Sequence, residues 1–217
     1  MLEIVPISNR VYEGEPIERG GTSIKGQGAA PPARWLWGRY VRPGMKVLDY
    51  GAGKYGRNAI HFREKGAHVY AYDPFNGEDT DGWTGVSKTP PTGRFDVAFT
   101  CYVLNVLPAP TEDDVIEIVE GFAPCQVHIT RNIDILDSVR ESVEKGSKVI
   151  PRFVAEHYGD VDVATMDRDA LFDLCCFGVQ TSEKPQRFQR IPLLSRKGFK
   201  LVKATNRYKV FHREDGS

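Results

Sequence analysis

The chain has 217 residues, of which 41% are hydrophobic and 27% are charged, and its formal net charge at pH 7 is zero. This length and composition fit one soluble α/β domain with a sizeable core. No apolar run approaches the roughly 20 residues of a membrane span, and the N-terminal stretch has no basic start followed by an apolar run. We therefore expect neither a membrane anchor nor a signal peptide. The four cysteines form no CxxC pair, which favours reduced thiols in a cytoplasmic protein without a metal site.

The net charge of zero conceals a strong segregation of charge along the chain. Residues 111–173 contain fifteen acidic and six basic residues, whereas residues 184–213 contain ten basic residues and no acidic one. Such asymmetry is typical of a surface that attracts an anionic partner, for example a nucleic acid. Alternatively, the acidic and basic segments neutralise each other across one fold. The sequence leaves both interpretations open.

Short apolar runs alternate with amphipathic segments along most of the chain. Residues 1–34 come first, and their Gly, Pro and polar residues predict an arm or lid. The elements then predicted, in chain order, are a helix at 34–41, a strand at 46–50, a helix at 57–65, a strand at 68–72, an irregular connection at 76–93, a strand at 94–101, a helix at 112–122 capped by Thr111, a strand at 125–130, helices at 133–145 and 167–177, and two strands within 193–213. This alternation implies a mostly parallel sheet that is covered on both faces.

The stretch Asp49-Tyr50-Gly51-Ala52-Gly53 carries the strongest chemical signal. A hydrophobic strand delivers an acidic residue into a turn where glycines permit unusual φ values and close approach of a ligand. The helix that follows presents free N–H groups beside that ligand. Asp73 ends the second strand 24 positions later, where a carboxylate can grip a ribose diol. In open α/β sheets, ligands bind beyond the carboxyl ends of such strands.

A glycine-rich turn after a first strand also occurs in nicotinamide and flavin binders, so it does not identify the ligand by itself. In this chain the acid Asp49 precedes the glycines, and we interpret Tyr55 as taking the place of the last glycine of a dinucleotide G-x-G-x-x-G motif. We take both features to disfavour a nicotinamide-dependent oxidoreductase, which remains an alternative that a comparison of ligands can test.

The Asp49-x-Gly51-x-Gly53 pattern with a later acidic strand end resembles the first two motifs of the class I S-adenosylmethionine (SAM)-dependent methyltransferase family. Phe95-Asp96-Val97-Ala98, the segment 102–107 and the Lys197-Gly198-Phe199 region resemble later motifs of that family, in the family's order. The resemblance implies a Rossmann-like, doubly wound sheet of seven strands, mostly parallel with an antiparallel last strand. It further implies a single methyltransferase domain over residues 1–217, in which residues 1–34 and an insertion at 147–192 cover the substrate.

The resemblance also implies which residues bind the cofactor SAM. Asp49 and the turn residues Gly51, Ala52 and Gly53 are expected near the amino acid moiety. Asp73 and the adjoining Pro74 are expected at the ribose. The side chains expected to line the site at the end of the fourth strand of the family's sheet are those of Thr100 and Tyr102, and those considered for stacking on adenine are Phe75 and Trp83.

No catalytic base stands out in the sequence, because methyl transfer from a sulfonium needs mainly positioning and removal of one proton. The candidate bases are His128, His157 and Tyr102, although a structural role is the simpler interpretation of His128. Lys25 and Arg131 are candidates for contact with an anionic substrate.

A narrower resemblance links the segments 20–32, 48–53 and 102–107 to methyltransferases associated with DNA phosphorothioation and to phage relatives. Thr100-Cys101-Tyr102-Val103 does not match the (D/N/S)PP(Y/F) motif of enzymes that methylate amino groups of DNA, and Pro124-Cys125 is misplaced for a cytosine-C5 enzyme. These departures disfavour conventional methylation of duplex DNA bases.

The sequence therefore predicts a SAM-dependent methyltransferase that moves a methyl group to an O or N nucleophile. The acceptor is a small molecule or a nucleic acid, and residues 184–213 form a possible contact for an anion or a nucleic acid. The alternative is an accessory protein that binds SAM without catalysis.

Overall fold

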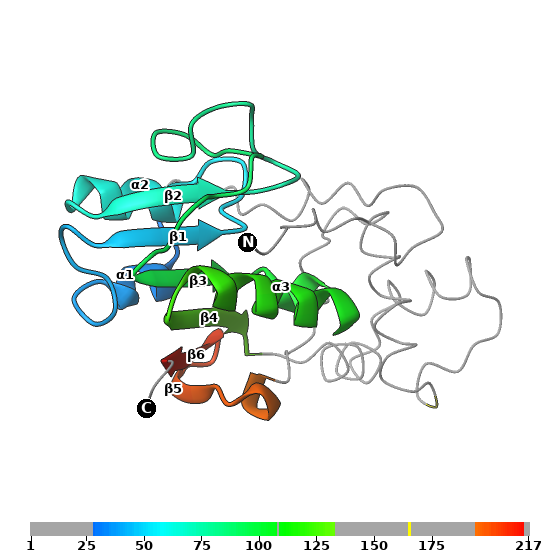
Figure 1. Cartoon of the computed structure of the whole chain (residues 1–217). Coiled ribbons are helices and arrows are strands. Elements are labelled where there is room, and N and C mark those ends of the chain that lie inside the picture. The colour runs from blue at the N-terminus through cyan, green and yellow to red at the C-terminus, as the bar shows by residue number, and fades with distance from the viewer. Residues whose placement is uncertain (1–27, 108, 133–164, 166–193, 215–217) are drawn as a thin grey trace, which may run out of the picture.

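The computed structural model describes residues 28–107, 109–132, 165 and 194–214. These residues form a sheet in the order β2-β1-β3-β4-β6-β5, with helices on both faces (Figure 1). The strands are β1 (Lys46–Tyr50), β2 (His68–Tyr72), β3 (Val97–Cys101), β4 (Cys125–Arg131), β5 (Lys200–Ala204) and β6 (Tyr208–Glu214). The helices are α1 (Pro31–Leu36), α2 (Arg57–Glu64), α3 (Ala109–Phe122) and two short 3-10 turns, η2 (Leu104–Val106) and η4 (Leu194–Lys197).

Two apolar layers separated by the sheet form the core of the described part. Side chains alternate between the faces of a strand, so Leu48 and Ala98 point to one face while Val47 and Val97 point to the other. The first face is covered by α3, which crosses in front of β3 and β4 in Figure 1. The second face is covered by apolar side chains of α1 and α2. We call these faces the α3 face and the α1 face.

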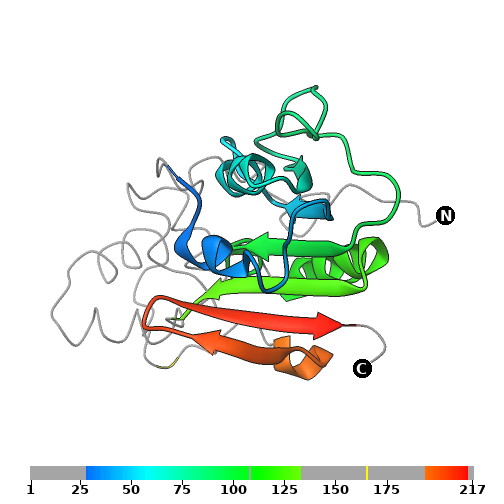
Figure 2. The same ribbon diagram turned by 90° about the vertical axis from the view of Figure 1, so that its left-hand side faces the viewer.

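The directions of the strands bring several loops to one edge of the sheet. β1 is parallel to β2 and β3, and β3 is parallel to β4. β6 is reversed and pairs antiparallel with β4 and β5, which Figure 2 shows as a hairpin along one side of the sheet. The carboxyl ends of β1 to β4 therefore lie at the same edge, which we call the carboxyl edge. The turn of the β5–β6 hairpin lies there too, because Tyr208 pairs with Arg131 at the end of β4.

The mostly parallel sheet with one reversed strand agrees with the expectation, but the number of strands differs. The sheet has six strands in the part of the chain that the structure describes, rather than seven. The helices predicted at 133–145 and 167–177 lie outside the described residues, as do residues 1–27 of the arm and, apart from Thr165, the 147–192 insertion.

An irregular segment covers the outer edge of β2, where a further strand would otherwise pair. The N–H of Ala71 donates to Gly82 O at 2.8 Å, and the N–H of Ser87 donates to Ala71 O at 2.9 Å. The N–H of Asp73 in turn donates to Ser87 O at 2.9 Å. This pairing satisfies backbone groups of β2 that would otherwise be open to water or to another chain.

Arg63 on α2 anchors this irregular segment to the rest of the fold. Its Nε and Nη2 donate to Val69 O, at 3.0 and 2.9 Å. Nη2 also lies 2.6 Å from Gly82 O and 3.1 Å from Gly85 O, and Nη1 donates to Thr84 O at 3.1 Å. A planar guanidinium with five N–H donors suits several converging carbonyl groups. One side chain thus joins α2, the start of β2 and the segment at the sheet edge.

Two helices begin earlier than the sequence predicts. α1 spans Pro31–Leu36 rather than 34–41, because proline is well suited to the first helical positions, where its missing N–H costs nothing. α3 begins at Ala109, so the predicted cap at Thr111 is wrong. None of the helices within these described ranges combines the length and hydropathy that crossing a bilayer requires.

Replacing Arg63 by Met is expected to lower the free energy of unfolding by about 3 kcal/mol, because several partly buried carbonyl groups lose a charged donor at once. Arg34→Met is the matched control, since Arg34 is exposed on α1. Urea unfolding of the two variants measures the difference. Equal stability of the two variants would contradict the anchoring role of Arg63.

Candidate functional site

The site lies at the carboxyl edge, where the glycine-rich turn 51–56 connects β1 to α2. Gly51, Gly53 and Gly56 all have positive φ values, of 80°, 67° and 51°. The N–H groups of Gly51 and Ala52 donate to Tyr72 O at 2.8 and 3.0 Å, which fastens the turn to the end of β2. Gly56 is the N-cap of α2 and makes no side-chain hydrogen bond, so the cap residue itself satisfies none of the N–H groups of the first turn.

Asp73 is the second fastening between the turn and β2. Its Oδ2 accepts the N–H of Gly53 at 2.8 Å, while its Oδ1 accepts the N–H groups of Phe75 and Asn76 at 3.0 and 2.8 Å. Asn76 adds its side-chain amide to Oδ1 at 3.2 Å. Each carboxylate oxygen has about two lone-pair sites, and Oδ2 uses one of them, so Oδ2 keeps capacity for one more donor. Asp73 therefore holds two turns of the site in place and retains an acceptor position.

Gly51 is required by the close approach of a neighbouring loop. A Cβ atom placed on Gly51 would lie 2.3 Å from Cγ2 of Val103, far inside van der Waals contact. Val103 reaches this position because Tyr102 before it adopts a left-handed φ of 63°, which is rare for a non-glycine residue. The N–H of Tyr102 donates to Ile129 O at 2.9 Å and so ties this loop to β4. The contribution of Val103 could not be foreseen from the sequence, which offers only a common apolar residue.

Asp49 is fully buried on the α1 face, next to the turn. No side chain among the described residues donates a hydrogen bond to its carboxylate oxygens, and the backbone N–H of Ala59, in the first turn of α2, lies close enough to act on them. Burial raises the pKa of Asp49 to about 7. The Arg63 guanidinium and the backbone N–H of Ala59 act to lower this pKa, whereas the nearby Asp73 carboxylate acts to raise it. Because no atom of Asp49 reaches the surface, its charge rather than a direct contact acts on whatever occupies the turn.

Thr100 does not line the site surface as expected, and His128 takes the structural role that was its simpler interpretation. Both are fully buried on the α3 face, where Thr100 Oγ1 lies 2.9 Å from His128 Nδ1. Burial, with a smaller effect of Arg213, lowers the pKa of His128 to about 3, so the imidazole is neutral at physiological pH. Phe199 packs edge-on against its ring. This pair is part of the core, and its orientation follows from the strand register.

Tyr102 is the one candidate base that the structure places at the carboxyl edge with a partly exposed side chain. Burial and the neighbouring Cys101 raise the pKa of its phenol, while Arg131 opposes the shift. The phenol therefore stays protonated and can donate a hydrogen bond, but it is a poor base at neutral pH. His157 and Lys25, the remaining sequence candidates, lie outside the described residues.

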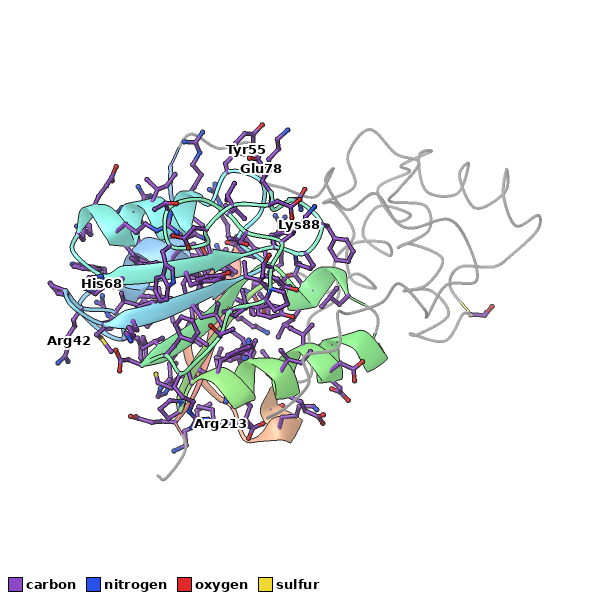
Figure 3. All side chains as sticks on the ribbon, turned by 45° about the horizontal axis from the view of Figure 1, so that its top comes forward. Arg42, Tyr55, His68, Glu78, Lys88 and Arg213 are labelled. Carbon is purple, nitrogen blue, oxygen red and sulfur yellow. The ribbon has the colours of Figure 1, made fainter. Side chains whose placement is uncertain are left out.

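The two aromatic candidates for adenine stacking lie in different places. Phe75 follows the Asp73 turn and is 41% exposed, at the carboxyl edge. Trp83 instead stacks on Phe95 at 5.9 Å and meets Tyr70 edge-on at 5.3 Å. Phe95 precedes β3, so Trp83 packs away from the glycine turn, and its expected role is not supported. Figure 3 shows Tyr55 of the turn on the same side as Glu78, with His68 at the opposite edge of the sheet.

A glycine-rich turn after the first strand, an acidic residue at the end of the second and a reversed strand in a parallel sheet together define the class I SAM-dependent methyltransferase fold. The sequence model of the methyltransferase domain matches residues 36–195, more than half of the chain, and the protein belongs to that family. No curated protein is a match to this chain.

Solved structures resemble the fold at low sequence identity. A Rhodobacter sphaeroides protein provisionally described as a Zn-dependent alcohol dehydrogenase has a TM-score of 0.51 at 14% identity, covering 92% of this chain and 96% of its own. Magnesium protoporphyrin IX methyltransferase from Synechocystis PCC 6803, solved with bound SAH, has a TM-score of 0.46 at 14% identity, with 84% and 80% covered. The cyclopropane synthase MmaA2 from Mycobacterium tuberculosis has a TM-score of 0.48 at 13% identity, with 79% and 60% covered. At such identities the likeness concerns the fold alone.

The interpretation of Tyr55 as a replacement for the last glycine is wrong, because that glycine is present as Gly56. Gly51, Gly53 and Gly56 together satisfy the G-x-G-x-x-G spacing, so Tyr55 does not distinguish the two ligand classes. The match to the methyltransferase domain makes the distinction instead. Among the residues that the structure describes, no group of three or more His, Cys, Asp or Glu side chains is arranged to hold a metal ion.

Replacing Gly51 by Ala is expected to destabilise the protein more than Gly93→Ala. Both positions have a φ above 75°, but a Cβ on Gly93 meets nothing within 4 Å. The backbone cost of about 1–2 kcal/mol is thus common to both variants, and the clash with Val103 is particular to Gly51. Thermal unfolding of Gly51→Ala, Gly93→Ala and Gly51→Ala/Val103→Ala tests this. The double variant should recover part of the loss; a double variant no more stable than Gly51→Ala would contradict the steric explanation.

Asp49 is expected to make stability fall as pH rises from about 4 to 7. Its pKa in the folded state is about 7, above the value near 4 of an unfolded chain, so the folded protein binds the extra proton in this window. Stabilisation by the protonated carboxyl is complete below pH 4 and is lost through pH 7, by up to about 4 kcal/mol. Asp49→Asn removes this dependence, whereas Asp79→Asn, at an exposed carboxylate, does not. Urea unfolding at several pH values compares them, and identical pH profiles of wild type and Asp49→Asn would exclude the effect.

Proposed function

We propose that this protein transfers a methyl group from SAM to an oxygen or nitrogen nucleophile. The observation that carries the proposal is the hydrogen bond from Gly53 N–H to Asp73 Oδ2, which unites the glycine turn and the acidic end of β2 in one site. Residues of this chemistry suit the parts of SAM: a ribose diol, an amino acid group and an adenine ring.

The residues at the carboxyl edge fit the cofactor part by part. The free acceptor position of Asp73 Oδ2 suits a ribose hydroxyl, and Pro74 adjoins it. The uncapped N–H groups at the start of α2 suit a carboxylate, as do the positive ends of helices in general. The buried carboxylate of Asp49 beneath the turn favours an ammonium group nearby. The exposed ring of Phe75 suits adenine.

SAM supplies an electrophilic methyl group on a sulfonium, so the protein needs only to align the acceptor and take up one proton. Tyr102 is our candidate for contact with the acceptor, as a protonated phenol that donates a hydrogen bond and orients the nucleophile. Gly51 and Val103, packed against each other, support the turn and the Tyr102 loop. The acceptor is a small molecule or a nucleic acid.

Asp73→Asn is expected to weaken binding of S-adenosylhomocysteine by on the order of tenfold to a hundredfold, because a neutral amide oxygen is a weaker acceptor for a hydroxyl than a carboxylate. Asp96→Asn is the matched control: Asp96 accepts the N–H of Lys46 at 2.7 Å, at the opposite edge of the sheet. Isothermal calorimetry measures the affinity of the two variants for S-adenosylhomocysteine and, as the competing ligand class, for NAD. Binding of NAD but not of S-adenosylhomocysteine would overturn the proposal.

Turnover is tested with SAM carrying a labelled methyl group in a cell extract, which is then separated into DNA, RNA, protein and small-molecule fractions. Label in one fraction, absent with Asp73→Asn and present with Asp96→Asn, supports methyl transfer and names the acceptor class. Cofactor binding with no label in any fraction would instead support an accessory protein that binds SAM without catalysis.

A further inference from the structure

A surface rich in basic side chains extends over the α1 face, next to the proposed catalytic site. We call it the α1-side basic surface. Its residues come from three parts of the chain that lie far apart in the sequence: the segment 34–42 (Arg34, Arg39 and Arg42), the C-cap of α2 (Lys65) and β5 (Lys200 and Lys203). Residues 28–48 contain no acidic side chain, and neither do residues 194–213. We propose that this surface binds the phosphate backbone of a nucleic acid, and that the nucleic acid is the methyl acceptor. The identity of the acceptor rests on the function proposed above.

Aromatic rings, not carboxylates, hold several of these cations in place. The Arg39 guanidinium lies 4.7 Å from the Trp35 ring centroid, and Lys203 Nζ lies 4.9 Å from it. Lys65 Nζ lies 5.3 Å from the centroid of Trp37. A cation over a ring face is oriented by the ring quadrupole, yet it keeps its full positive charge. The rings thus arrange the cations without neutralising them.

Among the described residues, the salt bridges of the fold leave this surface uncompensated. On the α3 side, Lys197 pairs with Asp113 at 3.0 Å and Arg213 pairs with Glu120 at 2.8 Å. Within the described ranges no salt bridge involves any member of the α1-side basic surface. Two acidic residues of the described ranges flank this surface: Glu64, which acts on His61, and Glu214, which acts on His212. The α3 helix therefore neutralises part of the basic segment, and the other face stays positive.

The surface reaches the carboxyl edge, where the methyl group is to be transferred. Lys203 pairs with Val210, which pairs with Ile129 near the end of β4. Beyond Lys203, the hairpin turn carries the exposed Arg207, whose carbonyl accepts the N–H of Asn132 at 3.3 Å. Arg131 lies close enough to Tyr102 to oppose the rise that burial causes in the pKa of its phenol. A strand of phosphates that follows these cations would thus bring its nucleotides to Tyr102 and the glycine turn.

The phosphate backbone of a nucleic acid suits this surface better than an anionic membrane does. Membrane binding needs exposed apolar side chains beside the cations. Leu201, which is 52% exposed, pairs with Phe211 and therefore faces the α3 side, opposite Lys203. Lysines on an edge strand such as β5 also prevent pairing with other chains. That role does not explain Arg39 and Arg42, which lie beyond the end of α1 and not on a strand edge.

The test measures binding of fluorescein-labelled oligonucleotides, RNA and DNA of one sequence, by fluorescence anisotropy at several salt concentrations. Arg39→Gln/Lys203→Gln should weaken binding on the order of tenfold and reduce the slope of log K against log salt by about 1.4, or about 0.7 per lost phosphate contact on a single strand. Arg42→Gln/Lys200→Gln, which leaves the Trp35 ring contacts intact, should act in the same direction. Whichever of RNA and DNA binds more tightly identifies the sugar of the acceptor.

The matched control is Lys88→Gln/Arg94→Gln, which removes the same two charges from the segment between β2 and β3. Lys88 pairs with Asp79 and Arg94 donates to Gly121 O, and Figure 3 shows Lys88 on the side of the molecule away from Arg42. This control should bind oligonucleotide as the wild type does. Equal binding by all variants, or binding of phosphatidylglycerol vesicles without binding of oligonucleotide, would overturn the proposal.

Calorimetry with S-adenosylhomocysteine separates this proposal from the proposed function. Both surface variants should bind S-adenosylhomocysteine with unchanged affinity, because none of their residues contacts the glycine turn. Loss of oligonucleotide binding with intact cofactor binding supports the surface. If wild-type protein binds oligonucleotide but not S-adenosylhomocysteine, the nucleic-acid surface stands and the methyltransferase function fails.

Discussion

The hydrogen bonds of the Asp73 carboxylate hold together the two loops on which the site depends. Gly53 belongs to the turn after β1, whereas Phe75 and Asn76 belong to the turn after β2, and one side chain accepts N–H groups from both. Hydrogen bonds to a charged acceptor are roughly twice as strong as neutral ones, so a single carboxylate can fix two irregular segments. This works because parallel strands end at the same edge. The position of Asp73 at the end of β2 is therefore a condition for the shape of the site as well as a source of its chemistry.

Arg63 has the corresponding role at the outer edge of β2. A regular strand at that edge would satisfy the backbone of β2 through a ladder; here an irregular segment supplies a few hydrogen bonds and the guanidinium supplies the rest. The helix that carries Arg63 begins at the glycine turn, and the segment it anchors begins at the Asp73 turn. The outer edge of β2 and the candidate site are consequently held in place by the same two turns. Arg63 also acts to lower the pKa of the buried Asp49, so the residue that closes the edge of the sheet favours the ionised form of the carboxyl under the turn.

The sequence predicted the parts of this fold that depend on local patterns. Apolar runs gave β1 and β2 their correct bounds, and the spacing of Asp49, the glycines and Asp73 located the turn and the second strand end. It was harder to predict which side chains of β3 and β4 point to which face of the sheet. This depends on the register, and a shift of one residue moves every side chain to the other face. Thr100 was expected to line the site, although its register directs it into the core beside His128. Arg63 has no sequence signature at all, since its partners are carbonyl groups of an irregular segment.

The sheet also explains how a chain of zero net charge can present a strongly positive face. Arg213 on β6 and Lys197 in η4 reach acidic residues of α3, while Lys200 and Lys203 alternate to the opposite face of the same hairpin. The sheet and its side chains separate charges on its two faces, and solvent-exposed charges farther apart than the Debye length, about 8 Å at physiological salt, are largely screened from each other. Among the described residues the two interpretations of the segregated charge are therefore compatible: α3 pairs with Lys197 and Arg213, whereas no salt bridge there involves Lys200 or Lys203. A partner responds to the field of the face it meets rather than to net charge.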